Sequence, residues 1–504
     1  MRFRDPKPAR VDDLRLTKPT AHAPTRTLSR FVAHLALTTV VTACLALSAG
    51  AEQQQMFGRL FPELAPYDAP DDATLDALTA AETTAQPPTP GPLFDDLTNG
   101  NNPAGVPAFF TYFGQFLDHD MTLDSLPLPV DFVDPTTIVN DRDQRLNLDS
   151  VYGSRKRPNP ALYEADGKHL KVNGRDLPRT GTGAAIIGDP RNDENQVIAQ
   201  IHVAFLRAHN ALIDQGVKFE DARRLIEWRH QWIVVHEFLP EVLDPDVYKD
   251  VFRTRGTESY VTQIRTRFYD PKKAEKGEMP VEFSVGAYRF GHSQVRGAYR
   301  IAEHRPPDSP APFIQVFSSD PAVDDLRGGR PIVPSHVIFW PNFVNVDDMP
   351  PAVNISRKID TLLSPGLFAL PIPGAEASGS AILAKRNIQR AREYGLPSGQ
   401  AVAARLDLPV LSNEDIVAAI PRLQGLLDAA YKDAAPLWLY ILAESQIVHD
   451  GAKLGPVGSR IVAEVIGGLL AADKDSYIRR GYVPEGGTYR VQDLLRDAGV
   501  LAVN

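Results

Sequence analysis

The pattern of apolar and polar positions is most distinctive over residues 109–124, which read FFTYFGQFLDHDMTLD. At about 100° per residue this stretch predicts a helix with two contrasting faces. One face carries Thr111, Gln115, Asp118 and His119, and the other carries Phe109, Phe113 and Phe116 with Asp120 among them. A carboxylate within an apolar stripe is costly unless a cation or strong donors compensate it. The pattern therefore indicates a buried helix whose polar residues belong to a functional site. The alternative is a surface helix end with solvated acids and a core histidine.

The pattern along the rest of the chain is mostly helical. Apolar residues recur at helical spacing over residues 197–212, and further helices are predicted over 219–242 and 436–470. The 43 prolines predict many irregular connections between helices. We therefore expect a mostly α fold with few short strands and long irregular connections. One large domain would cover residues 102–504, preceded by an arm over the surface at residues 53–101.

The N-terminal segment, residues 1–52, has the pattern of a targeting signal. Residues 31–49 are largely apolar, follow two arginines and run into the small residues at 48–51, as in a signal peptide with its cleavage site. Residues 41–44 also resemble a lipobox that would attach lipid to Cys44. A disordered tail with an amphipathic anchor is the alternative. We expect export, which would leave the mature protein extracytoplasmic or secreted and without a stable membrane span.

Composition and charge narrow the possible chemistry. A formal net charge of −9 argues against nucleic acid as the main partner. The single cysteine, Cys44, excludes internal disulfides and cysteine-ligated zinc or iron–sulfur sites. Any metal must therefore be held by histidine, carboxylate and carbonyl ligands. His236 and Glu237 lack the second histidine of the zinc-protease motif, which excludes that class.

A loop rich in oxygen donors follows the first helix. Asp143, Asn147 and Asp149 alternate with apolar residues, and Arg145 lies between them. Calcium takes about six to eight oxygen ligands, carbonyls included, in a loose geometry that such a loop can supply. Asp120 would complete the site from the helix, so we assign these five residues to a calcium site. A polar turn before a strand explains this segment alone equally well.

A second polar cluster, residues 188–194 (GDPRNDE), forms a turn that leads into a helix. Arg191 and Glu194 fall in the first turn of that helix or just before it. Without further information, a surface salt bridge is the simplest role for Arg191. His202 and His209 lie two turns apart on the same helix, and we expect them to be packed or solvated rather than metal ligands.

Together these segments resemble the animal-type haem peroxidases of the peroxidase–cyclooxygenase superfamily. The matching motifs occur in the family's order and are Gly114–Asp120 (GQFLDHD), Val151–Gly153 (VYG), Gly188–Arg191 (GDPR), Arg289–His292 (RFGH), Asn387–Arg390 (NIQR), Gly395–Pro397 (GLP) and Leu454–Gly458 (LGPVG). Chance does not explain several motifs in order over roughly residues 55–485. The resemblance implies a single large helical haem peroxidase domain. It would hold haem b between the helix at 109–124 and the segment that carries His292.

On the proximal side of the haem, the resemblance assigns His292 as the iron ligand. It implies that Asn387 accepts the hydrogen of the other ring nitrogen of His292, which fixes the tautomer and strengthens the ligand. Arg289 and Arg390 match residues that bind the haem propionates, and guanidinium groups suit carboxylates.

On the distal side, the resemblance implies that His119 acts as general base toward hydrogen peroxide and then as acid toward the leaving oxygen. Arg191 would stabilise negative charge as the O–O bond breaks. Gln115 would hold water or bind a halide. Asp118 and Glu194 occupy the positions that form ester bonds to the haem in mammalian members.

Two segments depart from the family pattern. In the loop assigned to calcium, Asp143 stands in place of the usual threonine and Asn147 in place of the usual aspartate, so the number of acids is retained. Residues 392–395 read REYG where the family has RDHG, which changes local hydrogen bonding.

Three functions remain open at the level of sequence. The first is a peroxidase that uses hydrogen peroxide to oxidise halides, thiocyanate or small aromatic donors. The second is a fatty-acid dioxygenase of the same superfamily, which needs a tyrosine three residues before the proximal histidine. Arg289 holds that position and Tyr288 is one residue further away, which favours the peroxidase. The third is a haem-binding protein with a vestigial pocket, against which the full set of site residues argues.

Overall fold

The computed structural model describes residues 55–68, 75–76, 101–124, 132–155, 158–270, 272–273, 276–303, 313–318, 320, 322–352, 354–371, 381–424, 427 and 434–501. The predicted targeting segment, residues 1–52, lies outside these described residues. Among the helices that the structure describes, none is both long enough and apolar enough to cross a membrane.

The described part of the chain is mostly helical, as the sequence predicts. Its α-helices are α3 (Phe109–Met121), α4 (Asp149–Tyr152), α5 (Gln196–Asp214), α6 (Phe219–Ile233), α7 (Leu239–Val242), α8 (Pro245–Val251), α10 (Leu383–Glu393), α11 (Gly399–Arg405), α12 (Asn413–Ala419), α14 (Leu437–His449), α15 (Pro456–Ala472), α16 (Tyr477–Arg480) and α17 (Val491–Asp497). Two π-helical turns are η4 (Val234–Phe238) and η5 (Glu282–Gly286). The 3-10 helices are η1 (Pro135–Thr137), η2 (Pro160–Leu162), η3 (Pro190–Asp193), η6 (Ala287–His292), η7 (Pro334–His336), η8 (Trp340–Asn342), η9 (Pro365–Phe368), η11 (Pro421–Leu423) and η12 (Glu485–Gly487).

The strands of the described residues are short and form separate pairs. β1 (Met56–Gly58) runs parallel to β4 (Glu278–Pro280). β2 (Phe252–Arg253) is antiparallel to β3 (Gln263–Ile264), and β5 (Ala298–Arg300) is antiparallel to β6 (Phe313–Gln315). These pairs fasten loops to the helical body and build no sheet layer.

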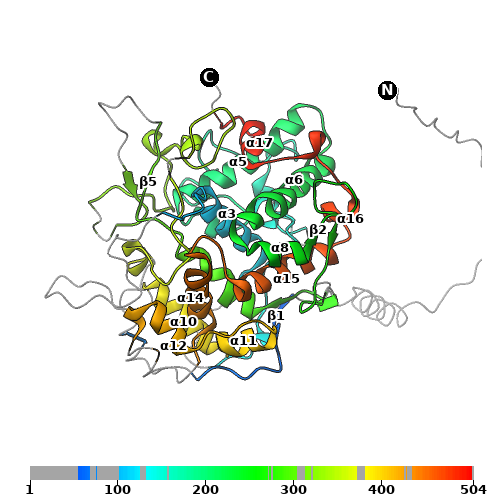
Figure 1. The fold of residues 1–504 in the computed structure, drawn as a ribbon. Helices are drawn as coiled ribbons and strands as arrows, with labels where there is room; N and C mark the ends of the chain where they lie inside the picture. Colours follow the sequence, from blue (N-terminus) through cyan, green and yellow to red (C-terminus); the bar gives the residue numbers. More distant parts are fainter. Residues whose placement is uncertain are drawn as a thin grey trace, which may run out of the picture. The chain divides into compact units, whose positions relative to one another are not determined.

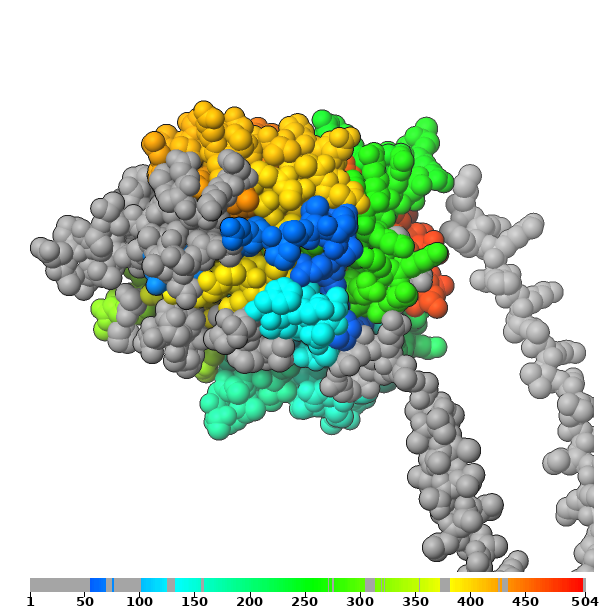
Figure 2. Space-filling model, turned by 90° about the horizontal axis from the view of Figure 1, so that it is seen from below, coloured from blue at the N-terminus to red at the C-terminus, as the bar shows by residue number. Residues whose placement is uncertain are grey.

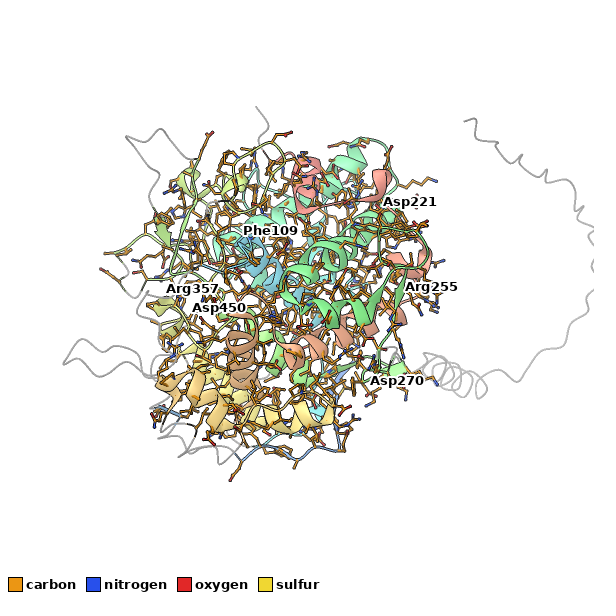
Figure 3. The ribbon with its side chains drawn as sticks, viewed as in Figure 1. Phe109, Asp221, Arg255, Asp270, Arg357 and Asp450 are labelled. Carbon is orange, nitrogen blue, oxygen red and sulfur yellow. The ribbon has the colours of Figure 1, made fainter. Side chains whose placement is uncertain are left out.

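Helix α3 lies near the middle of the helical body, against α5 and η6 (Figure 1). Its aromatic face is packed as the pattern predicts: the Phe116 ring stacks on Phe205 with ring centroids 4.9 Å apart. Figure 3 shows Phe109 in the interior, whereas Asp221 lies toward the edge of the view. Asp120 is wholly buried, and the main-chain N–H groups of Leu148 and Ser150 donate to its carboxylate at 3.0 and 3.3 Å. Donors from the following loop therefore compensate the carboxylate in the apolar stripe.

Residues 55–68 of the predicted arm add to the core as well as to the surface. In Figure 2 this blue segment lies between yellow and green parts of the chain. Phe57 and Phe61 are buried, and the main-chain N–H groups of Leu60 and Phe61 donate to the buried carboxylate of Glu282 at 2.8 and 3.1 Å. Arg59 donates to the carbonyl oxygens of residues 394 and 395 at 2.7 and 2.8 Å.

The segment that carries His292 is helical, but it is not a continuous α-helix. The π-helical turn η5 passes directly into the 3-10 helix η6, and Gly286 joins them at φ −104° and ψ −89°. A Cβ atom on Gly286 would lie 3.0 Å from Leu437 Cδ2 on α14, so a larger residue would require the leucine side chain to shift. Apolar spacing alone could not predict this junction, because segments of 5 and 6 residues are too short for the periods of π, α and 3-10 turns to be told apart.

The first turn of α15 is capped by a buried carboxyl group on α14. Glu444 accepts hydrogen bonds from the N–H groups of Val457 and Gly458, at 3.0 and 3.4 Å. A Cβ on Gly455 would lie only 2.4 Å from Glu444 Cγ, so the glycine makes room for the cap. Burial raises the pKa of Glu444 to about 7, because desolvation outweighs the donated hydrogen bonds.

This cap gives a prediction about stability and pH. Since the folded-state pKa of Glu444 lies above its usual value, its stabilising contribution is fully present below about pH 4.5 and is lost as the pH rises through about 7. Glu444→Gln keeps an acceptor without a charge. As the pH rises from 5 to 8, we expect the free energy of unfolding of the wild type to fall by about 1–3 kcal/mol relative to that of the variant. Urea unfolding of both proteins at the two pH values measures this, and an unchanged difference would contradict the assignment.

Candidate active site

A cavity of about 550 Å³ lies between α3 and η3 on one side and η6 and α10 on the other. Helix packing brings together segments that are far apart in the sequence, such as those carrying Gln115 and Arg390. The residues predicted for the distal and proximal sides all line this one cavity: Gln115, Asp118, His119, Arg191, Glu194, Arg289, His292, Asn387 and Arg390. The structure therefore assembles in one place the residues that the motifs suggested.

His119 lies at the distal wall, near the C-terminal end of α3, and is only 4% exposed. Its Nδ1 atom is 2.9 Å from Oδ1 of Asn192, and its Nε2 atom is 4.0 Å from Oε2 of Glu194. Burial and the nearby charge of Arg191 lower the pKa of His119 to about 4. The imidazole is therefore neutral at pH 7 and able to accept a proton.

Arg191 is fixed on the side of η3 that faces α3. Its guanidinium donates to Asp189 at 2.7 Å and to the carbonyl oxygens of Thr122 and His119 at 2.6 and 3.2 Å. Burial alone would raise the pKa of Asp189, but hydrogen bonds and charge from Arg191, with help from Arg142, lower it to about 2. Arg191 is thus half-buried in a hydrogen-bonded network anchored on the buried Asp189, and its charge is held in place before any ligand arrives.

Gln115 lies one helical turn before His119 and joins α3 to the start of α5. Its amide nitrogen donates to Glu194 at 3.1 Å, and its amide oxygen accepts from Nδ2 of Asn195 at 3.1 Å. The Oδ1 atom of Asn195 also caps α5 by accepting from two main-chain N–H groups. Sequence analysis assigned Asn195 no role at the site, although its position before an apolar helix is a typical N-cap signal.

Asp118 and Arg289 face one another within the cavity at 3.3 Å. Thr122 also donates to Asp118, at 2.9 Å. Burial opposes ionisation of Asp118, but the charges of Arg289 and Arg191 outweigh it and lower the pKa of the carboxyl group. Arg390 is similarly paired, with Asp124 at 3.2 Å. Both arginines assigned to haem propionates therefore carry carboxylate partners from this chain.

On the proximal wall, Nδ1 of His292 is 2.9 Å from Nδ2 of Asn387. Burial, followed by the charges of Arg289 and Arg386, lowers the pKa of His292 to about 3, so its imidazole is neutral. The structure thus places the amide nitrogen, a donor, where the resemblance implied the amide oxygen, an acceptor. Iron ligation through Nε2 requires hydrogen on Nδ1. In a ligated state the Asn387 amide would have to be turned by 180°.

Three of the five residues assigned to calcium, Asp143, Arg145 and Asn147, are hydrogen-bonded to one another. Asp143 accepts from Arg145 and from the amide of Asn147, so its carboxylate is already paired. Asp120 and Asp149 lie close enough for the charge of one to raise the pKa of the other, after the larger effect of burial. Within the described part of the chain, no three histidine, cysteine or acidic side chains are grouped for a metal ion.

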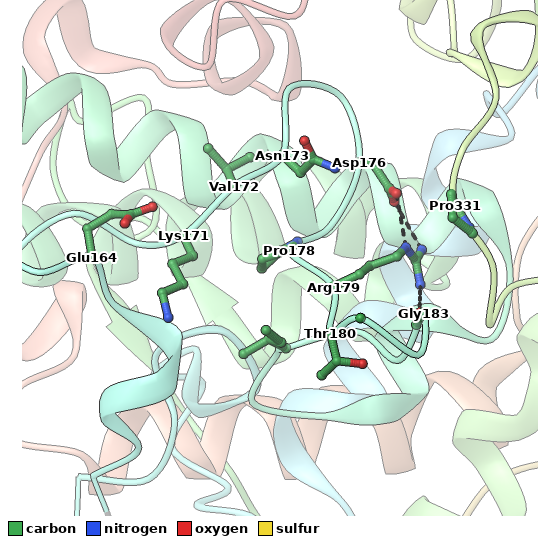
Figure 4. Close-up of a pocket in the computed structure, with 12 residues that line it drawn as sticks. Glu164, Lys171, Val172, Asn173, Asp176, Pro178, Arg179, Thr180, Gly183 and Pro331 are labelled. Carbon is green, nitrogen blue, oxygen red and sulfur yellow. Dashed lines mark hydrogen bonds and ion pairs between the residues drawn. The ribbon is translucent and has the colours of Figure 1, made fainter.

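A second hollow, of about 660 Å³, opens at the surface over residues 164–186 (Figure 4). Its main charged feature is Arg179, which donates to Asp176 at 2.9 Å and to Asp193 at 2.7 Å. Asp193 ends η3 and also lines the central cavity. The ion pair between Arg179, at the edge of this hollow, and Asp193 therefore anchors the segment that carries Arg191.

Comparisons with known proteins point to the same family as the motifs. The family model "Animal haem peroxidase" matches residues 128–474, which include η3, η6 and α10 but begin after α3. The chain is similar to Peroxinectin A of Dictyostelium discoideum, at 23% identity over 76% of this chain and 79% of that protein. It is also similar to thyroid peroxidase of Sus scrofa, at 25% identity over 59% of this chain but only 31% of that protein.

Solved structures give the same picture of the fold. Peroxidase A from Dictyostelium discoideum superposes with a TM-score of 0.62 at 18% identity, covering 90% of this chain and 95% of that one. A fatty acid alpha-dioxygenase from Oryza sativa superposes with a TM-score of 0.59 at 15% identity, covering 89% and 80%. The family match spans more than half of the sequence, and the chain therefore belongs to the animal haem peroxidase family.

Proposed function

We propose that this protein is a haem-dependent peroxidase that reduces hydrogen peroxide while oxidising a halide, thiocyanate or a small aromatic donor. The observation that carries the proposal is the pairing of a neutral buried His119 and a fixed Arg191 across one cavity from a neutral His292. Peroxide cleavage needs one group that moves a proton both ways and one cation that stays in place.

The residues of the cavity fit haem b, the cofactor that the family implies. Its volume of about 550 Å³ is within the range of about 300–1,000 Å³ that is usual for cofactor sites. His292 would supply the axial nitrogen, and Arg289 and Arg390 would approach the propionates. Asp118 and Glu194 lie on the cavity wall, where ester attachment would be possible. When bound, the haem supplies the two-electron redox chemistry.

The residues of the chain supply the proton transfers and the electrostatics. The Nε2 atom of His119 would take the proton from the peroxide oxygen that attacks, and would return it to the oxygen that leaves as water. Arg191 would stabilise the negative charge that develops on the leaving oxygen. Gln115, held by Glu194 and Asn195, would orient water or a halide beside His119.

Fatty-acid dioxygenation is the second candidate, and one observation favours it. Tyr288 lines the cavity, is buried, and its hydroxyl has no hydrogen-bond partner. The solved relatives also include fatty acid alpha-dioxygenases. The first candidate remains preferred because Arg289, not a tyrosine, stands three residues before His292.

Tyr288→Phe separates the two candidates. The change removes only a hydroxyl, so a peroxidase should keep its rate of guaiacol or bromide oxidation within about twofold. A dioxygenase that used this hydroxyl should lose linoleate oxygenation altogether. Both proteins are assayed with bromide, guaiacol and linoleate, with peroxide consumption and oxygen uptake followed separately. Oxygen uptake with linoleate that disappears in the variant would overturn the peroxidase assignment.

We also propose that calcium binds beside α3, with a smaller set of ligands than the sequence suggested. Three buried oxygens have no hydrogen-bond partner: Oδ1 of Asn147, Oδ1 of Asp149 and Oγ of Ser150. Asp120 and Asp149 supply two carboxylates whose pKa burial raises, and a cation between them would relieve that cost.

Calcium removal tests this site. At a calcium concentration of about 100 times the Kd, binding stabilises the fold by about 2.7 kcal/mol, which should raise the Tm by about 3 °C. Asp149→Asn should abolish the shift, and magnesium should not replace calcium. An unchanged Tm after treatment with a chelator and after adding calcium would rule the site out.

A further inference from the structure

Asn192 lies directly behind His119 and joins it to a second buried histidine. Its Oδ1 atom is 2.9 Å from Nδ1 of His119, and its Nδ2 atom is 3.0 Å from Nδ1 of His202 on α5. Asn192 and His202 are both fully buried. Neither residue is part of the motif roles described above, and sequence alone suggested that His202 is merely packed or solvated.

With the Asn192 amide oriented as in this structure, its oxygen faces His119 and its nitrogen faces His202, and the direction of both hydrogen bonds follows. An amide oxygen can only accept, so Nδ1 of His119 must carry the hydrogen. An amide nitrogen can only donate, so Nδ1 of His202 must present its lone pair. In a neutral imidazole the second nitrogen then has the opposite role. The lone pair of His119 is therefore on Nε2, the atom on the side of Glu194.

His202 is suited to hold this arrangement. Burial lowers its pKa to about 3, so the ring is neutral and its Nδ1 can accept a hydrogen bond. Its ring packs edge-on against Phe116, with centroids 6.2 Å apart, and Phe116 belongs to the same helix as His119. The ring is fully buried, and its Nδ1 is directed at Asn192.

We propose that Asn192 and His202 are positioning residues that hold His119 in the tautomer with hydrogen on Nδ1 and a free lone pair on Nε2. The tautomer itself is inferred from the hydrogen bonds. Its role in catalysis rests on the proposed function, because a base that takes a proton from peroxide needs that lone pair. Without His202 as acceptor, the Asn192 amide could turn and donate to His119 instead. The hydrogen of His119 would then move to Nε2, where it blocks proton uptake.

A matched pair of variants separates this hydrogen bond from simple packing. His202→Leu removes the acceptor, whereas His202→Asn keeps an acceptor atom close to the former Nδ1 position. Both variants lose the ring contact with Phe116, so a packing effect alone would change them alike. The tautomer of His119 is read in the full chain without added haem, by nitrogen NMR of labelled histidine, with the signal assigned by its loss in His119→Ala.

We expect hydrogen on Nδ1 of His119 in the wild type and in His202→Asn, and a mixture of tautomers in His202→Leu. A wild-type His119 with hydrogen on Nε2 would overturn the proposal, even if neither variant folds. So would identical tautomer ratios in the two variants.

The rate of peroxide consumption by the haem-loaded proteins gives an independent reading. It should fall roughly three- to tenfold in His202→Leu and recover in His202→Asn, because a smaller share of molecules has the productive tautomer. An equal loss of rate in both variants would contradict the positioning role. If the wild type itself does not consume peroxide, the proposed function fails, whereas the NMR result still decides the tautomer.

Discussion

His119→Ala is expected to slow the reaction of the haem-loaded protein with hydrogen peroxide by about 10²–10⁴-fold, the usual contribution of a general acid–base residue. The structure gives the reason: His119 is the neutral imidazole on the distal wall, and Arg191 beside it remains charged and cannot accept a proton. Stopped-flow absorption after mixing with peroxide measures the rate constant.

Haem uptake should be unchanged in this variant, because His119 lies across the cavity from the proposed iron ligand. His169→Ala is a suitable control, since it removes a histidine that is only partly buried and lies outside the cavity. A rate within about threefold of wild type in His119→Ala would show that another group moves the proton.

His292→Ala is expected to weaken haem binding by more than about 100-fold. Loss of a residue that only supports a metal ligand typically costs about 10–100-fold in affinity, and loss of the ligand itself should cost more. Asn387→Ala should therefore fall between wild type and His292→Ala. Titration of each full-length protein with haem, followed by absorption, gives the affinities.

Two further measurements distinguish loss of the iron ligand from a general loss of haem affinity. Added imidazole should occupy the space left in His292→Ala and restore part of the wild-type spectrum. Arg390→Ala should weaken haem binding without changing the axial ligand band, because its expected contact is with a propionate. Equal haem affinity in wild type and His292→Ala would remove His292 as the ligand.

Sequence was sufficient where one segment carries both its fold and its chemistry. In residues 109–124 the spacing of the phenylalanines and the polar residues is enough to predict α3 (Phe109–Met121), although it left open whether His119 is catalytic or a core histidine. Arg191 and His292 could be linked to His119 only through the family resemblance, because 70 or more residues separate each of them from it. The spacing of residues along a helix shows which of them share a face, but not which distant segments meet after folding.

The hydrogen-bond and ion-pair partners of the site residues could not be predicted from the sequence for the same reason. Asp124 meets Arg390 and Asn192 meets His202 only after the helices pack. A buried histidine on an apolar helix looks structural in a sequence, and only its 3.0 Å contact with Asn192 suggests more. In the loop assigned to calcium, the sequence likewise could not show that Asp143 pairs with its near neighbour Arg145.

The most direct test of the central claim is the absorption spectrum of the haem-reconstituted wild-type protein, recorded before and after one equivalent of hydrogen peroxide. A peroxidase built on His119, Arg191 and His292 should show a histidine-ligated Soret band that shifts within milliseconds to seconds and returns when bromide or guaiacol is added. A protein that takes up haem but leaves this band unchanged in peroxide would contradict the proposed function. A protein that takes up no haem would contradict the assignment of the cavity itself.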